Sequence, residues 1–166
     1  MTLILFIETA TPVCSVALAR GDELLGVKES IKKNSHSEIV TVFIDELLKE
    51  NDLVFEDLNA IAVSKGPGSY TGLRIGVSTA KGICYALDIP LISVNTIHSL
   101  ALGAGQDHIK DSNLPTLYCP MLDARRMEVY CALFDENINE VRETKAEVIE
   151  PNSFQSYLEK YRVIFF

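Results

Sequence analysis

Several glycines lie between an apolar run and a helical pattern in this chain. Their spacing comes closer to a known ligand-binding motif than that of any other residues. The stretch KGPGSYTGLRIG spans residues 65–76, and its turn contains Gly66, Pro67, Gly68, Ser69 and Thr71. Glycine-rich turns before a helix often bind phosphate, because free backbone N–H groups and the positive end of the helix dipole face the ligand. The turn lacks the G-x-x-x-x-G-K-[ST] pattern of a P-loop, and Gly66, Gly68 and Gly72 miss the G-x-G-x-x-G fingerprint by one residue. We therefore favour a structural strand-to-helix turn over a nucleotide site.

The helical pattern at 72–87 carries a ridge of small residues spaced by four. These residues are Gly72, Gly76, Ala80 and Cys84. Two glycines inside a helix cost roughly 1 kcal/mol each relative to alanine, so the ridge needs a reason. Close approach of a backbone within the same fold and close approach of a second subunit explain it equally well. Arg74 lies in the first turn, where the helix dipole disfavours a cation, so we expect it to meet a carboxylate or another acceptor.

Two acids end apolar runs at matching places in the two halves of the chain. Glu8 ends the first run, and Asp123 ends the run TLYCPMLD. In the duplicated fold of sugar kinases, actin and Hsp70-type ATPases, acids at these points help to place a metal–nucleotide complex. Neither ETATPVCS nor DARRMEVY continues into the expected glycine-bearing phosphate hairpin. A vestigial nucleotide site and plain turn-capping acids both stay open, and the DARRMEVY turn is assigned no chemistry.

A metal site finds little support in the sequence. His36 and Glu38 lie two apart, whereas a zincin helix needs H-E-x-x-H, and Glu38 has capping-box spacing with Ser35. The cysteines form no C-x-x-C pair and lie in apolar surroundings, which is typical of buried free thiols in a reducing compartment. They are Cys14, Cys84, Cys119 and Cys131. We predict no metal site.

Composition restricts the partners and the compartment. The chain has 166 residues, 48% of them hydrophobic and 23% charged, with a formal net charge of −8. An acidic chain repels a phosphate backbone, and Lys32-Lys33 and Arg125-Arg126 are isolated pairs, so nucleic acid is expected only through a partner. The run before Glu8 is too short for a signal peptide, and no run approaches the ~20 residues of a membrane helix. We expect a cytoplasmic protein without membrane contact.

Periodicity predicts an α/β fold. Strands are expected at 3–9, 13–20, 23–29, 60–64 and 91–94, and helices at 37–51, 72–87 and 96–102. The apolar stripe of the first helix includes Val40, Phe43, Ile44 and Leu47. The order β-β-β-α-β-α-β-α predicts the mixed five-stranded sheet of a ribonuclease-H-like lobe, which we place at residues 1–104.

The second part of the chain repeats the opening pattern weakly. A polar, turn-rich segment at 103–115 is expected to be a linker, and TLYCPMLD and MEVYCALF then follow the order of the first two strands. We therefore predict a duplicated architecture with a partial second lobe at 105–166. The chain stops on the apolar strand RVIFF, so we expect a C-terminal part to be missing.

Four stretches together carry a family resemblance. They are LILFIETATPVCSVAL, NSHSEIVTVFIDELL, VSKGPGSYTGLRIGVSTAKGICYALDIPLISVNTIHSLA and LDARRMEVYCALF. They resemble the B-type subunit family of bacterial tRNA threonylcarbamoyladenosine biosynthesis, the TsaB family, also filed as glycoprotease-like. The resemblance covers residues 3–134, and GPGSYTGLRIG is its most specific part. It departs where many relatives have Asp in place of Glu8 and Gly in place of Met127.

The resemblance implies a sugar-kinase/Hsp70/actin fold and a role in making N6-threonylcarbamoyladenosine next to the tRNA anticodon. It implies a non-catalytic subunit that binds and stabilises the D-type threonylcarbamoyl transferase, with an E-type ATPase as a third component. ATP and metal are then expected on the partner subunits, and tRNA is reached only through the complex. Without a partner, the apolar interface surface is itself expected to allow a homodimer. The implied partner interface lies on the two long helices, and its expected contacts are Val40, Phe43, Ile44, Leu47, Gly72, Arg74, Gly76, Ala80 and Cys84.

Two enzyme classes stay open beside this interpretation. The first is a nucleotide-binding ATPase or phosphotransferase of the same fold, with ATP near Glu8 and Asp123. The second and less favoured class is a metalloprotease, for which the sequence offers neither a zinc motif nor a catalytic triad.

Overall fold

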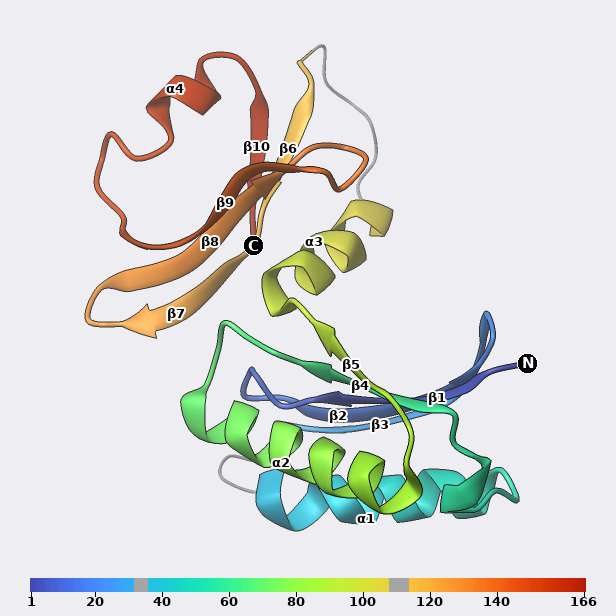
Figure 1. The fold of residues 1–166 in the computed structure, drawn as a ribbon. Coiled ribbons are helices and arrows are strands. Elements are labelled where there is room, and N and C mark those ends of the chain that lie inside the picture. Colours follow the sequence, from blue (N-terminus) through green and yellow to red (C-terminus); the bar gives the residue numbers. More distant parts are fainter. Residues whose placement is uncertain (32–35, 108–113) are drawn as a thin grey trace. The chain divides into compact units, whose positions relative to one another are not determined.

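The computed structural model describes residues 1–31, 36–107 and 114–166 (Figure 1). Contacts divide the chain into two compact units, Met1–Val94 and Asn95–Phe166. Ser35, the expected cap of the first helix, and the Lys32-Lys33 pair lie outside the described residues.

The first unit contains a five-stranded sheet of order β3-β2-β1-β4-β5. Its strands are β1 (Leu3–Glu8), β2 (Cys14–Arg20), β3 (Glu23–Ser30), β4 (Ala60–Ser64) and β5 (Leu91–Val94). Strands β1 to β3 form an antiparallel meander, whereas β4 pairs parallel to β1 and β5 parallel to β4. This is the mixed sheet that the sequence predicted for a ribonuclease-H-like lobe, so the prediction is confirmed.

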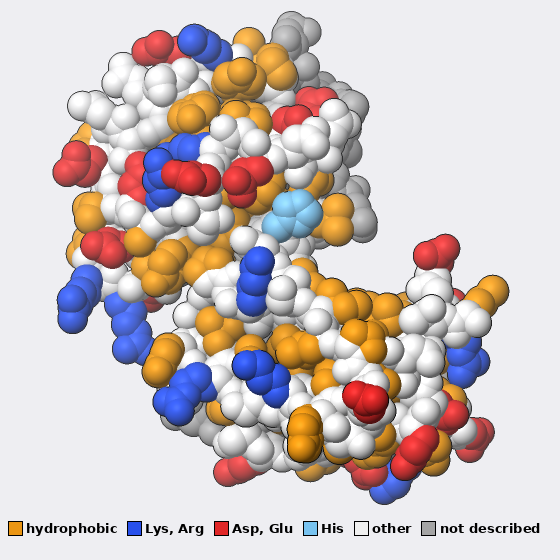
Figure 2. Space-filling view, in the orientation of Figure 1, with side chains coloured by type: hydrophobic (Ala, Val, Ile, Leu, Met, Phe, Trp, Pro, Cys, Tyr) orange, Lys and Arg blue, Asp and Glu red, His pale blue; other side chains and the backbone are white. Residues whose placement is uncertain are grey.

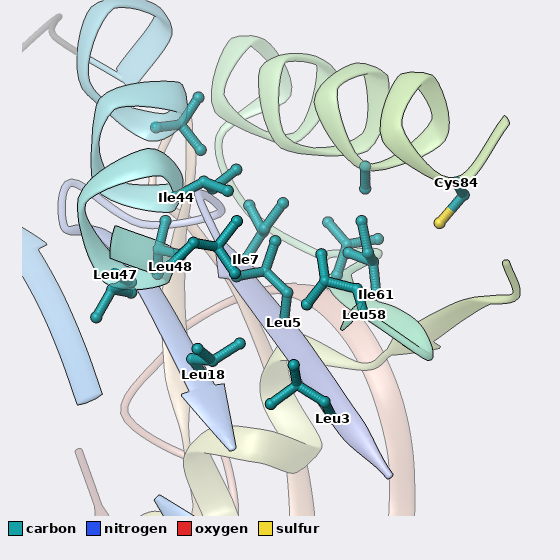
Figure 3. Close-up of a cluster of buried hydrophobic side chains, with 14 of the residues drawn as sticks. Leu3, Leu5, Ile7, Leu18, Ile44, Leu47, Leu48, Leu58, Ile61 and Cys84 are labelled. Carbon is teal, nitrogen blue, oxygen red and sulfur yellow. The ribbon is translucent and has the colours of Figure 1, made fainter. Parts of the chain in front are cut away.

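Two long helices cover one face of this sheet, α1 (His36–Glu50) and α2 (Tyr70–Leu87) (Figure 1). A short 3-10 helix, η1 (Phe55–Asp57), lies between α1 and β4. Alternate residues of β1 and β2 point towards the helices and are buried, as a half-buried strand requires. Figure 3 shows the resulting core, which includes Leu3, Leu5, Ile7, Leu18, Ile44, Leu47, Leu48, Leu58, Ile61 and Cys84.

The second unit repeats the strand pairing of the first. Its elements are α3 (Thr96–Asp107), β6 (Thr116–Cys119), β7 (Met121–Arg125), β8 (Glu128–Phe134), β9 (Glu140–Val148), α4 (Gln155–Leu158) and β10 (Arg162–Phe165). Strand β10 pairs parallel to β6, β8 pairs antiparallel to β6 and β7, and β9 pairs antiparallel to β8. The same relations connect β4, β1, β2 and β3, so the pairing supports the duplication expected from the sequence.

One residue divides the first strand of the second unit. Pro120 lacks a backbone N–H, and it separates β6 from β7. The partners Tyr118↔Phe134 and Met121↔Cys131 nevertheless keep one register along β8. Strands β6 and β7 are therefore one interrupted strand, equivalent in its pairing to β1.

The division between the units falls after Val94, ten residues before the expected boundary at 104. Helix α3 explains the difference, because its buried Ile97 and Ala101 pack in one cluster with Tyr118, Ala132 and Phe134 of the second sheet. Its sequence pattern alone does not say which sheet the helix covers.

Candidate functional site

The glycine turn is held against the loop that follows β1. Ser69 donates its backbone N–H to the Ala10 carbonyl oxygen at 2.7 Å, and its hydroxyl accepts from the Gly72 N–H at 3.2 Å as the N-cap of α2. Gly68 has φ +153°, and a Cβ there would overlap the Ala10 carbonyl. Gly66 has φ +101°, which also favours glycine. The fold itself therefore accounts for the glycines of this turn.

The ridge of small residues on α2 lies inside the first unit. A Cβ on Gly72 would overlap the Thr9 carbonyl oxygen, and a Cβ on Gly76 would overlap the Thr9 hydroxyl. Ala80 and Cys84 continue the same buried line. Of the two explanations that the sequence left open, the structure supports close packing within the fold.

Most of the expected partner contacts are core residues. Val40, Ile44 and Leu47 of α1 are each about 1% exposed, and Phe43 is partly buried against the same core. With the four small residues of α2, seven of the nine expected contacts are buried, and Arg74 is the only exposed one. The seven therefore offer a partner almost no surface in this structure, and the choice of interface residues stays a prediction. The role of the two helices in pairing stays a prediction.

The opposite side of α2 is exposed, and it is the part of the candidate site that the sequence reasoning missed. Tyr70 is 74% exposed and Tyr85 is 92% exposed. The Arg74 guanidinium lies 5.5 Å from the centre of the Tyr70 ring, within cation–π range. A shallow hollow of about 360 Å³ is lined by Thr71, Arg74, Ile75 and Ser78. The sequence could have indicated this surface, because the period of an α-helix places these residues on the side opposite to the glycines.

Glu8 closes the end of β1 through internal hydrogen bonds. One carboxylate oxygen accepts from the Ala10 N–H at 2.5 Å, and the other accepts from the Ser64 hydroxyl at the end of β4. Beside it, burial and the negative charge of Glu8 raise the pKa of Cys14. These contacts favour the turn-capping explanation of Glu8.

Asp123 caps the turn between β7 and β8 in a similar way. Its carboxylate accepts from the Arg125 N–H at 2.7 Å. Arg125, Arg126 and Met127 then follow with φ of 68°, 55° and 67°. Side chains rarely adopt this left-handed backbone, and each such residue costs about 1 kcal/mol or more. The angle at Met127 also explains why the family resemblance expects glycine there.

The described histidines and cysteines form no metal site. His36 contacts the Thr11 carbonyl oxygen through Nε2 at 3.1 Å, and His98 packs edge-on against Phe134 at 5.4 Å. Among residues 1–31, 36–107 and 114–166, no three of the His, Cys, Asp and Glu side chains gather as metal ligands. All four cysteines are buried free thiols, as predicted.

A small, partly buried polar cluster surrounds Cys131 in the second unit. The Arg142 guanidinium donates to its Sγ at 3.0 Å, forms an ion pair with Glu147 at 2.8 Å, and lies 4.5 Å from the centre of the Phe154 ring. Burial, assisted by neighbouring Cys131, raises the pKa of Cys119 to about 12. These thiols therefore stay protonated near neutral pH and are poor nucleophiles.

Comparison with known proteins identifies the family. The family model described as TsaD: tRNA N6-adenosine threonylcarbamoyltransferase matches residues 19–156. The chain belongs to this family. It is 37% identical over 131 residues to the tRNA threonylcarbamoyladenosine biosynthesis protein TsaB of Bacillus subtilis, covering 79% of this chain and 54% of that protein. It is 34% identical over 151 residues to TsaB of Escherichia coli, covering 89% of this chain and 62% of that protein.

A solved structure gives the same relationship. YeaZ from Pseudomonas aeruginosa matches with a TM-score of 0.69 and 25% identity, covering 92% of this chain and 69% of that one. The resemblance to TsaB seen in the motifs is therefore confirmed. The chain spans 54% and 62% of the lengths of the two TsaB relatives. Within the described residues, no helix is long and apolar enough to cross a membrane.

Proposed function

We propose that this protein is a non-catalytic subunit that binds and stabilises the D-type threonylcarbamoyl transferase during synthesis of N6-threonylcarbamoyladenosine in tRNA next to the anticodon. The observation that carries this proposal is the match of most of the chain to proteins named for threonylcarbamoyladenosine biosynthesis. The E-type ATPase is the third component. ATP and metal act on the partner subunits, tRNA is bound only through the complex, and the complex works in the cytoplasm.

The geometry at the end of β1 supports a role without catalysis. Both carboxylate oxygens of Glu8 are engaged with Ala10 and Ser64, and Asp123 caps its own turn. At the N-terminus of α2, the Gly72 N–H already donates to the Ser69 hydroxyl. The two acids that the sequence offered for a nucleotide site are thus engaged in holding the fold.

The surface proposed for the partner is the outer face of α2 with the adjoining exposed residues of α1. Tyr70 and Tyr85 present large exposed rings about four helical turns apart. Exposed tyrosines contribute strongly to protein interfaces, because they bury a large area with few rotatable bonds. On α1, Val42 is also exposed, at 48%, and adds to the apolar area that the two helices present.

The test is light scattering on a size-exclusion column, with the chain alone and then mixed with the D-type transferase of the same cell. We expect a new peak with the mass of a one-to-one complex. Tyr85→Ala should weaken the pairing at least about tenfold, as loss of an interface anchor does. Met127→Ala removes another exposed side chain, 87% exposed in the second unit, and should leave pairing unchanged. Absence of any complex with a folded chain would refute the proposal.

The phosphotransferase alternative has its own measurement. Titration of the chain with Mg-ATP in a calorimeter should give no binding heat if Glu8 only holds the fold. Saturable heat that disappears in Glu8→Gln would favour the enzyme class instead.

A further inference from the structure

The turn between β7 and β8 carries residues that its backbone does not favour. Arg125 pairs with Glu128, so Arg126 and Met127 are the two residues of the turn itself. Both have positive φ, 55° and 67°, and two-residue hairpin turns of this kind strongly prefer Asn-Gly. Arg125 precedes them at a register shift with φ 68°, where glycine is again favoured. All three positions are therefore occupied by residues that destabilise the turn.

Nowhere else in the described residues is such strain concentrated. The other non-glycine residues with positive φ each stand alone in the sequence, and they are Asp52, Asp88, Ile138 and Phe154. Unfavourable backbone persists where the surroundings enforce it, and it is frequent at ligand-binding sites. Arg125, Arg126 and Met127 are all exposed, so packing does not enforce it here. A use for these side chains outside the fold would explain their presence.

The two arginines of the turn have no acidic partner in the described part of the chain. Arg142 of the same unit pairs with Glu147, whereas Arg125 and Arg126 form no ion pair with a described residue. The Asp123 carboxylate accepts from the Arg125 N–H at 2.7 Å, and so holds the backbone of the turn in place. Figure 2 shows blue side chains projecting from the region that the β7–β8 turn occupies in Figure 1. The turn therefore presents two consecutive arginines to solvent on a fixed backbone.

We infer that this turn binds backbone phosphates of the tRNA when the subunit is in its complex. The inference rests on the proposed function, whose substrate is a polyanion. A guanidinium group donates two parallel hydrogen bonds to a phosphate, which makes arginine well suited to such contacts. The chain has a net charge of −8 and repels RNA, so the two arginines add to binding that the rest of the complex provides.

The RNA is a better occupant than an acidic protein surface. A nucleic-acid strand carries a phosphate at every nucleotide, so a turn of two residues can bind it without a matching contour around the turn. A protein partner would need a carboxylate placed at this one point of its surface. The experiment below distinguishes the two.

The test is a charge reversal at the turn with a matched control. Arg125→Glu/Arg126→Glu is compared with Lys160→Glu/Arg162→Glu, which makes the same change in net charge at exposed residues of the same unit. Each variant is mixed with the D-type transferase of the same cell, and the dissociation constant for labelled tRNA is measured by fluorescence anisotropy at several salt concentrations. Reversal at the turn should raise this constant at least about tenfold and lower the slope of its salt dependence by about 1–2, whereas the control should change both little.

Two single variants separate the side chains from the strain. Arg126→Asn suits the turn but removes a guanidinium, so it should raise the midpoint of thermal unfolding of the free chain and weaken tRNA binding several-fold. Met127→Gly also relieves strain but keeps both arginines, so it should raise the midpoint and leave tRNA binding unchanged. If the charge reversal and Arg126→Asn both bind tRNA as the wild type does, the inference is overturned and the proposed function stands.

The competing occupant is measured with the same variants. Light scattering without RNA shows whether reversal at the turn separates the subunit from the transferase. If it does, the turn contacts the protein partner, and the inference is overturned. A wild-type chain that does not pair with the transferase would overturn both the inference and the proposed function.

Discussion

The contact between α2 and Thr9 allows a stringent test of the packing. A Cβ on Gly76 would overlap the Thr9 hydroxyl oxygen but would lie 3.4 Å from Thr9 Cβ and Cγ2, which is close to ordinary contact. Thr9 is completely buried, and its hydroxyl has no hydrogen-bond partner in the described part of the chain. The overlap at Gly76 is therefore with one oxygen atom that stabilises nothing by hydrogen bonding.

This geometry sets the expected free energies of unfolding. Gly76→Ala gains up to about 1 kcal/mol of helix propensity and loses about 1–3 kcal/mol to overpacking, so we expect a net loss of roughly 1–2 kcal/mol. Thr9→Ala removes the overlapping oxygen. The double variant Gly76→Ala/Thr9→Ala should therefore be at least as stable as Thr9→Ala alone, with a coupling energy of about 1–2 kcal/mol.

Two other glycines of the same helix serve as controls. At Gly72 the overlap is with the Thr9 carbonyl, which belongs to the backbone, so Thr9→Ala should not rescue Gly72→Ala. At Gly82 the space is open, so Gly82→Ala should stabilise by up to about 1 kcal/mol. Urea unfolding followed by far-ultraviolet circular dichroism measures all of these variants. A Gly76→Ala variant as stable as Gly82→Ala, or a rescue of Gly72→Ala by Thr9→Ala, would contradict this account of the packing.

Three further predictions use the same unfolding assay. Glu8→Ala should destabilise by about 1–3 kcal/mol, because the buried Ser64 hydroxyl and the Ala10 N–H lose their acceptor; an unchanged midpoint would contradict the role of Glu8. Asp88→Gly should stabilise by roughly 0.5 kcal/mol, since Asp88 ends α2 with φ 54° and glycine removes that strain; a loss of stability would count against it. Stability should fall as the pH rises above 9, because the pKa of Cys119 is about 12 in the folded protein against 9.0 normally, and unfolding then releases its proton. Cys119→Val should make that fall shallower.

The strand order of the first unit follows from local signals. Alternating burial in β1 and β2, the continuous apolar run of β4 and the helical periods of α1 and α2 are properties of short windows of sequence. The turn residues between them restrict how consecutive elements pair. These patterns are sufficient to predict the mixed sheet from the sequence.

No short window of sequence shows which face of a helix packs inside the fold and which face is exposed to a partner. Four small residues in line on α2 fit a subunit contact and an internal contact equally well. The choice depends on where Thr9 and Ala10 lie, more than 60 residues earlier in the chain. The same limit explains the boundary after Val94, since only the contacts of Ile97 and Ala101 assign α3 to the second sheet.

The division of α2 into two faces decides which variants can report on a partner. Leucine at Gly76 or Ala80 would lose pairing because it unpacks the lobe, so such a loss would say nothing about the interface. The inner face fixes the position of the helix on the sheet, whereas changes at Arg74, Lys81 and Tyr85 leave that packing intact. A variant that keeps its unfolding midpoint and loses the transferase identifies a contact. A variant whose unfolding midpoint and transferase binding fall together reports only on the packing that holds the helix in place.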